Sequence, residues 1–205
     1  FSSDIYGRNI WGSPSNSNAD FAWLQHMVKS IDAKTGRCAV VLPQGVLFRS
    51  GKEGNIRKQL ILSDKLDCVI TLVGNLFYGA GVSACILLLN NKKQADHQGK
   101  ICLIDASTIF TAQRAKNTLS ATNVEEIFKL YTDYIDVPEL VKIASNEEIT
   151  AKDYSLQVNN YIEKHVQEST SPDEVKQNFY KALDAVNAAE TKLYNLLVKG
   201  GYING

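Results

Sequence analysis

The sequence predicts an α/β protein, in which helices flank a largely buried sheet and a helical tail follows. Three observations indicate this class. Short, continuous apolar runs recur along the first half of the chain, and such runs are typical of strands buried on both faces. A helical segment separates the first two runs, as in a parallel crossover unit of a doubly wound sheet. Beyond residue 120 the pattern changes to helices with one apolar face.

The chain opens with a loop, a helix and a strand. Residues 2–18 are rich in Ser, Asn and Gly and are expected to form a loop. A helix is expected from Asp20, because apolar side chains recur on one face until Gly36 stops it. The apolar run 38–43 is expected to be a buried strand. The inward face of the helix consists of Phe21, Leu24, Met27, Val28 and Ile31.

Helices and strands alternate in the next part of the chain. A helix is expected at 55–63, and strands are expected at 67–73 and 84–89. The ten residues 74–83 between these strands are too few for a helical crossover. The two strands should therefore be antiparallel neighbours. A further apolar run at 101–106 predicts one more strand.

The region after residue 120 predicts shorter elements. Residues 122–126 read as a capping box that opens a helix, and Pro138 ends the element. Residues 145–148 start another short helix, and 153–163 alternate as a strand would. The residues expected to face inward from the first of these helices are Val124, Ile127, Phe128, Tyr131 and Tyr134.

The last helix carries a regular apolar seam. Ser171 is expected as its N-cap, Pro172 as its first residue and Glu174 as the partner in a capping box. A spacing of 3.5 residues selects a long partner helix, so the seam fits a contact with another subunit. The alternative is that the helix lies along its own domain. The seam consists of Val175, Phe179, Ala182, Val186, Ala189, Leu193 and Leu196.

Bulk composition narrows the class of protein. Twenty-two basic and twenty-two acidic residues cancel, so no overall charge indicates a nucleic-acid partner, although a local patch would suffice. The cysteines at 38, 68, 85 and 102 lie in apolar runs and are expected to be free, buried thiols. The histidines are scattered, which argues against a metal site. No apolar run reaches about 18 residues, so a cytoplasmic protein without a membrane span is expected.

Two loops with suggestive side chains follow the first and second strands. The first carries Arg49 and Lys52, and the second carries Phe77 and Tyr78 among glycines. Both should lie at the carboxyl ends of strands, where doubly wound sheets bind ligands. An aromatic face beside a basic rim suits stacked bases and phosphates. The alternatives are that the two rings pack beneath the sheet and that the cations form a solvated face.

Several familiar catalytic motifs are absent from the sequence. There is no P-loop, no G-x-G-x-x-G after a strand and no G-x-S-x-G elbow. No acid–base pair or Cys/His combination stands out. Asp105, at the end of the predicted strand 101–106, is in a suggestive position, but an Asp there is more often a cap or turn residue.

Four segments resemble the modification subunit of type I restriction–modification systems, a family of adenine-specific DNA N6-methyltransferases that use S-adenosylmethionine. The resemblance extends over about residues 1 to 162, and 153–163 are similar to the element that closes the catalytic domain in that family. The segments that carry it are 19–28, 36–62, 75–91 and 99–107.

The resemblance implies a fold and a division of the chain. The fold is the C-terminal half of a Rossmann-like class I S-adenosylmethionine-dependent methyltransferase sheet, followed by a helical tail. Residues 1–120 would belong to the catalytic domain, 121–168 to an α/β extension that closes it, and 169–205 to a helix for subunit contact. The family's glycine-rich cofactor loop is not in this chain, and Phe1 would end the Asn-Pro-Pro-Phe catalytic motif, so the chain is expected to be inactive alone.

The resemblance also implies roles and partners. Phe1 would stack on an adenine flipped from double-stranded DNA, with Phe77 or Tyr78 as the opposing wall and Arg49 and Lys52 beside the DNA. The partners would be DNA, the specificity subunit, the restriction subunit and a second modification subunit, with the seam helix contacting the specificity subunit. Two other readings remain: a non-catalytic assembly module, or a class I methyltransferase acting on RNA or protein.

Overall fold

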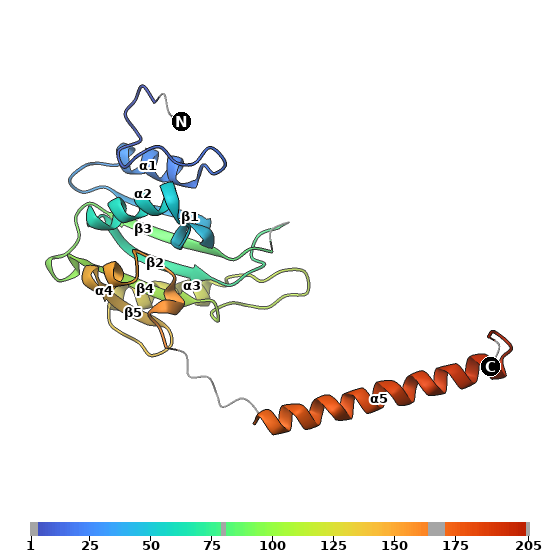
Figure 1. Ribbon diagram of the computed structural model, residues 1–205. Helices are drawn as coiled ribbons and strands as arrows, with labels where there is room; N and C mark the ends of the chain where they lie inside the picture. Colours follow the sequence, from blue (N-terminus) through green and yellow to red (C-terminus); the bar gives the residue numbers. More distant parts are fainter. Residues whose placement is uncertain (1–3, 79–80, 164–170, 204–205) are drawn as a thin grey trace. The chain divides into compact units, whose positions relative to one another are not determined.

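The computed structural model describes residues 4–78, 81–163 and 171–203. The chain divides into two compact units, Phe1–Lys164 and His165–Gly205. The first unit contains the sheet, and the second contains the long helix α5 (Pro172–Lys199) (Figure 1). The three-part division of the chain expected above stays a prediction.

The first unit is an open five-stranded sheet with helices on both sides, which confirms the predicted α/β class (Figure 1). The strand order is β1-β3-β2-β4-β5. In chain order the elements are α1 (Asp20–Ser30), β1 (Arg37–Pro43), η1 (Gln44–Leu47), α2 (Gly51–Leu62), β2 (Leu66–Leu72), β3 (Ala84–Asn90), η2 (Ala95–His97), β4 (Lys100–Ala106), α3 (Ala121–Asp133), β5 (Val141–Ser145), α4 (Asn146–Ala151) and η3 (Val158–Asn160).

The predicted antiparallel pairing of β2 and β3 is confirmed. β1 and β2 run parallel, as predicted for a crossover unit. They are not neighbours, however, because β3 lies between them and is antiparallel to both. Ile86 of β3 accordingly faces Val41 of β1 on one side and Ile70 of β2 on the other. β2 and β4 are parallel, and β5 adds an antiparallel edge. The strands β1, β2 and β4 therefore end at one edge of the sheet, called the carboxyl rim below.

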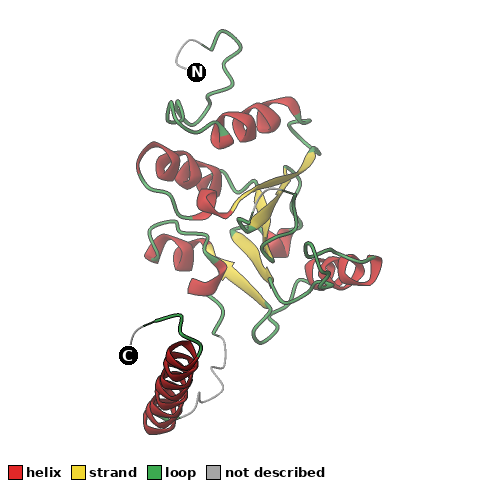
Figure 2. Ribbon diagram, turned by 90° about the vertical axis from the view of Figure 1, so that its right-hand side faces the viewer, coloured by secondary structure: helices red, strands yellow, loops and turns green. Residues whose placement is uncertain are grey.

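Each face of the sheet has its own apolar core, with α1, α2 and α4 over one face and α3 over the other (Figure 2). Alternate residues of a strand point to opposite faces, so β2 contributes Val69 to the first core and Ile70 to the second. All seven residues of β2 are buried, including the polar Asp67 and Thr71, which explains why its central residues Cys68, Val69 and Ile70 are apolar on both faces. The helices seal the first core with Phe21, Leu24, Ile56, Leu60 and Ile149.

The four cysteines are free thiols, as predicted. Cys68, Cys85 and Cys102 are buried, and Cys38 is half-buried. Burial raises the pKa of the Cys85 thiol to about 12. Because the thiolate is the reactive form, these buried side chains are packing residues.

The structure differs from the prediction in two places after Pro138. The strand β5 was not expected, because its five residues are too short to show a clear period. Residues 153–163 do not form a strand: Asp153 and Tyr154 have φ values of 51° and 54°, and η3 follows. Leu156 and Val158 still point into the core. The alternation of apolar residues therefore predicted the buried positions correctly but the backbone conformation incorrectly.

The first two helices differ from expectation at their ends. α1 stops at Ser30 instead of continuing to Gly36. The Asp32 carboxylate accepts hydrogen bonds from the backbone N–H groups of Lys34 and Thr35, which closes a turn before β1. α2 starts at Gly51, four residues earlier than predicted.

The start of α3 is also different from the prediction. Its capping box uses Ser120 and Asn123 instead of residues 122–126. Ile127 is buried and Tyr131 is partly buried, but Val124 and Phe128 are 52% and 62% exposed. The apolar face of α3 is therefore wider than the part that the sheet covers.

The long helix α5 begins as predicted, with Ser171 as N-cap and Pro172 in the first turn. The Ser171 hydroxyl accepts a hydrogen bond from the Glu174 backbone N–H at 3.2 Å. Within residues 171–203 of the second unit, α5 is the only helix or strand, and the large residues of the seam are exposed: Val175, Phe179, Val186, Leu193 and Leu196. Among the described helices, none is both long and apolar enough to span a membrane.

The side chain of Arg57 connects three separate parts of the first unit. It is 4% exposed and donates hydrogen bonds to the backbone carbonyls of Tyr154 (2.8 Å), Val46 (3.2 Å) and Arg49 (2.7 Å). Burial lowers the pKa of Arg57. Arg57 thus holds η1 and the segment before η3 against α2.

Replacing Arg57 by Ala is expected to lower the free energy of unfolding by about 3 kcal/mol, because carbonyls in a buried region lose their donor. The measurement is urea denaturation of the complete protein. Lys52→Ala, an exposed change in the same helix, is the matched control and should shift stability by less than about 0.5 kcal/mol. Equal effects of the two variants would contradict the role given to Arg57.

Candidate functional site at the carboxyl rim

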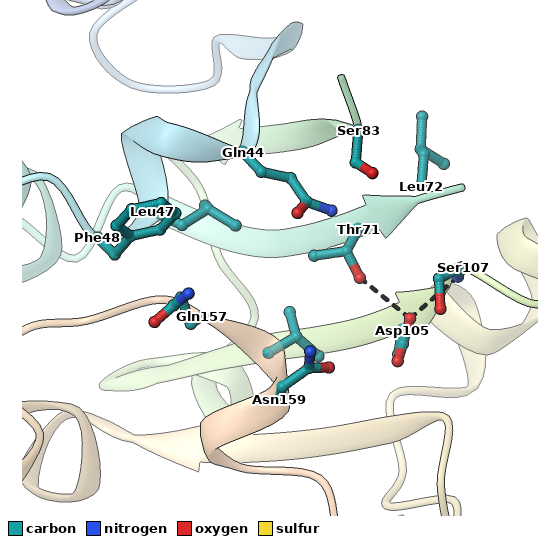
Figure 3. Close-up of a pocket in the computed structure, with 11 residues that line it drawn as sticks. Gln44, Leu47, Phe48, Thr71, Leu72, Ser83, Asp105, Ser107, Gln157 and Asn159 are labelled. Atoms are coloured by element: carbon teal, nitrogen blue, oxygen red, sulfur yellow. Dashed lines mark hydrogen bonds between the residues drawn. The ribbon is translucent and has the colours of Figure 1, made fainter. Parts of the chain in front are cut away.

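A pocket of about 230 Å³ opens at the carboxyl rim (Figure 3). The rim is closed on one side by a hydrogen bond from the Gln44 backbone N–H to the Ser83 carbonyl, 3.2 Å, which joins the end of β1 to the start of β3. Ligands of doubly wound sheets bind at such an edge. The lining residues are Gln44, Leu47, Phe48, Thr71, Leu72, Ser83, Asp105, Ser107, Gln157, Val158 and Asn159.

The carboxylate of Asp105 is held in place at the floor of this pocket. Asp105 is 3% exposed. One carboxylate oxygen accepts hydrogen bonds from the Thr71 hydroxyl at 3.2 Å and from the Ser107 backbone N–H at 3.0 Å (Figure 3). The bond to Ser107 is a local turn interaction, so the turn role considered for Asp105 is present. The same carboxylate also lines the pocket.

Uncharged amides supply much of the remaining polar lining. Gln44 follows β1, whereas Gln157 and Asn159 come from the segment around η3. Figure 3 shows the Gln44 amide pointing toward Thr71. Asn159 lies on the opposite side of the pocket from Gln44. A side-chain amide offers both a donor and an acceptor, and a pair of such groups can match the edge of a planar heterocycle such as adenine.

Sequence reasoning missed most of this lining. Thr71, Ser107 and Asn159 were not considered, since no motif marks them. Gln157 and Asn159 reach the rim only because residues 153–160 turn instead of extending. The hydrogen bond from the Leu156 backbone N–H to the Leu47 carbonyl, 2.8 Å, fixes this segment beside η1.

The loop between β2 and β3, which carries Phe77 and Tyr78 and which we call the aromatic loop, lies at the same rim, with both rings accessible. Phe77 is 47% exposed and Tyr78 is 82% exposed, so neither is packed beneath the sheet. The base of the loop is fixed by Asn117, whose side-chain amide donates to the Gly74 carbonyl at 2.9 Å. A side chain at Gly74 would come within 3.2 Å of the Ser83 hydroxyl, which explains why glycine opens the loop.

The two basic residues predicted beside this loop differ in their availability. Arg49 forms ion pairs with Asp20 at 2.9 Å and Glu53 at 3.2 Å. Burial lowers the pKa of Arg49, but the hydrogen bonds to these carboxylates outweigh it and raise the pKa overall. Lys52 is exposed and forms no ion pair with a carboxylate among residues 4–78, 81–163 and 171–203. Arg49 is thus largely occupied inside the protein.

The remaining predicted site residue, Phe1, lies outside the described residues. Of the predicted site residues that are described, Phe77 and Tyr78 lie at the same rim as the polar pocket. The basic loop with Arg49 and Lys52 follows η1 and enters α2, next to Phe48 of the pocket.

The rim pocket does not fit a nucleoside-sized cofactor such as S-adenosylmethionine. Its volume of about 230 Å³ lies below the range of about 300–1,000 Å³ that is usual for ligand sites. None of the loops that follow β1, β2 and β4 has the glycine pattern of a nucleotide-binding turn. We therefore assign no described residue to that cofactor.

Comparison with known proteins gives a consistent picture. The profile of the family described as N-6 DNA Methylase matches residues 2–170. The chain is 38% identical over 162 residues to the type I restriction enzyme MjaVIII methylase subunit of Methanocaldococcus jannaschii, covering 78% of this chain and 27% of that protein. It is 32% identical over 163 residues to the HindI methylase subunit of Haemophilus influenzae, covering 76% of this chain and 36% of the relative.

Solved structures show the same relationship. The type I restriction–modification methyltransferase subunit from Streptococcus thermophilus superposes with a TM-score of 0.72 at 32% identity, over 78% of this chain and 34% of that one. The EcoKI M protein, at 20% identity and a TM-score of 0.57, shares the fold. The chain spans less than half of each of these relatives, from 27% to 44% of their length. The sheet is thus part of a Rossmann-like methyltransferase fold, and the chain belongs to the N-6 DNA methylase family.

Proposed function

We propose that this chain is part of the modification subunit of a type I restriction–modification system and helps to transfer a methyl group from S-adenosylmethionine to N6 of an adenine in DNA. The observation that carries this proposal is the exposed pair Phe77 and Tyr78, fixed at the carboxyl rim of a sheet of this family. A base extruded from a duplex needs an aromatic surface to replace the stacking it loses.

In this proposal the chain binds and orients the target base. Phe77 or Tyr78 is one wall, and Phe1 is the other. The rings exclude water from the base edge, which strengthens hydrogen bonds to it. The methyl donor supplies the electrophilic methyl group and is held by residues outside the described part of the chain. Positioning and desolvation carry the catalysis, in accord with the lack of an acid–base pair in the sequence.

The basic residues contribute unequally in this proposal. Lys52 contacts a DNA phosphate as a mobile, exposed cation. Arg49 contributes less, because Asp20 and Glu53 already neutralise it. Its main task is to hold the start of α2 against α1, the helix that contains Asp20.

We propose that α5 binds the specificity subunit. Its exposed seam repeats with the period that suits a long partner helix. The restriction subunit and a second modification subunit complete the complex, which acts on double-stranded DNA in the cytoplasm. The second candidate, an assembly module without a catalytic role, is favoured by the same seam but leaves the exposed aromatic loop without a purpose.

The reaction can be tested on genomic DNA. Deleting the gene for this protein should remove N6-methyladenine from one sequence motif, as read by single-molecule sequencing, and restoring the gene should return it. Phe77→Ala should lower methylation at that motif, whereas Phe128→Ala, an exposed aromatic on α3, should not. An unchanged methylation pattern after deletion would overturn the proposed function. The alternative of a methyltransferase acting on RNA or protein would also fail if the purified protein leaves those substrates unmodified.

The seam can be tested in the assembled complex. Val186→Asp with Leu193→Asp should abolish co-purification with the specificity subunit, because two charges would be buried in an apolar contact. Gln177→Asp with Asn195→Asp adds the same charge on the opposite side of α5 and should leave assembly intact. Normal assembly of the seam variant would exclude this face as the contact.

A further inference from the structure

A second loop at the carboxyl rim is packed on the aromatic loop. It follows β4 and is closed by a β-bridge between Thr111 and Thr118. The two residues exchange backbone hydrogen bonds of 2.8 and 3.0 Å. We call residues 111–118 the bridged loop. Because β2 and β4 are parallel, this loop and the aromatic loop leave the sheet at the same end (Figure 1).

Three contacts join the bridged loop to the aromatic loop. The Asn117 side chain donates to the Gly74 carbonyl at 2.9 Å, and the Asn117 backbone N–H donates to the Asn75 carbonyl at 2.9 Å. The Lys116 ammonium lies 3.9 Å from the centre of the Tyr78 ring. A cation at this distance is attracted by the negative face of the ring. The Lys116 charge is thus fixed beside the residues proposed to face the base.

The bridged loop is a local positive region without internal compensation. It contains Arg114 and Lys116 and no acidic residue. Arg114 is exposed. In the described part of the chain, neither cation has a carboxylate within ion-pair distance, in contrast to Arg49 with its two partners. Two cations on one loop without an internal counter-ion produce a local positive potential that attracts an external anion.

We propose that Arg114 and Lys116 bind the backbone phosphates of the DNA strand that contains the target base. The inference rests on the proposed function, because it places these phosphates next to a base held by Phe77 or Tyr78. Extruding a nucleotide rotates its backbone, and cations fixed beside the aromatic wall stabilise the rotated phosphates. The contact carries no sequence information, so it suits a subunit whose specificity is decided elsewhere.

The salt dependence of DNA binding tests this assignment in the complete, assembled methylase. Each lost phosphate contact should reduce the slope of log K against log salt concentration by about 0.9. Arg114→Ala with Lys116→Ala should therefore lower the slope by about 1.8, and weaken binding by roughly tenfold near physiological salt, alike for specific and random duplexes. Arg114→Lys with Lys116→Arg keeps both charges and should restore most of the slope.

Lys29→Ala with Lys34→Ala is the matched control. Both lysines are exposed, at the end of α1 and in the turn before β1, and thus at the opposite edge of the sheet from the carboxyl rim. This variant should keep the wild-type slope. Thermal unfolding of each variant checks that the fold is intact, as expected for changes at these positions.

The outcomes separate this inference from the proposed function. If the wild-type complex methylates DNA but the Arg114/Lys116 variant binds with unchanged affinity and slope, the phosphate assignment is wrong and the proposed function stands. If the slope falls as expected but the wild-type complex modifies no DNA, the phosphate site stands and the proposed function fails. A slope that falls equally in the control would also overturn the assignment, because it would show general charge loss.

Discussion

The short connection between β2 and β3 is the constraint on which the rest of the first unit depends. It is too short for a helix to return the chain to the starting edge, so β3 must run back beside β2. Inserted between β1 and β2, β3 pairs with both and leaves them running in the same direction. The connection itself consequently becomes a loop at the carboxyl rim. Its aromatic residues are thus brought beside the ends of β1 and β4.

The charges around the rim follow from how each cation is partnered. Arg57 is buried and satisfied by backbone carbonyls, and Arg49 is held by two carboxylates. Both therefore stabilise the scaffold that presents the pocket. Arg114 and Lys116 lie on a loop without acidic residues and are available to an anion. A segment rich in cations is thus not always a surface open to a polyanion. Here Arg49 and Arg57 are occupied within the protein, whereas the two cations of the bridged loop have no ion-pair partner among the described residues.

Much of the fold could be predicted from the sequence because burial leaves a clear pattern. The four apolar runs correspond to β1, β2, β3 and β4, and the N-cap Ser171 marks the start of α5. β5 was missed because a five-residue edge strand has too little pattern. The sequence predicts a strand at 153–163 because Leu156 and Val158 alternate inward. The positive φ values of Asp153 and Tyr154, which turn the backbone, produce no periodic pattern in the sequence.

The site was less predictable than the fold. Doubly wound sheets bind ligands at the carboxyl ends of their strands, and this rule predicts the rim. It does not predict the lining supplied by Gln157 and Asn159, which depends on tertiary packing of η3. Composition predicts a basic loop, whereas one partner of Arg49, Asp20, comes from α1 and one partner of Arg57, the Tyr154 carbonyl, comes from the segment before η3. No local pattern records such long-range pairing. Similarly, the contact between Lys116 and Tyr78 joins residues far apart in the chain.

The central claim is that the aromatic loop is a wall for a base extruded from DNA. The most direct measurement is the affinity of the complete methylase for a duplex that contains its unmethylated target motif with a mismatch at the target adenine. Unpairing costs least at such a mismatch. The account predicts that Phe77→Ala with Tyr78→Ala weakens this binding by about 1–3 kcal/mol for each base-stacking ring, while Phe128→Ala leaves it unchanged. Equal affinity of the wild type and the Phe77/Tyr78 variant would contradict the account.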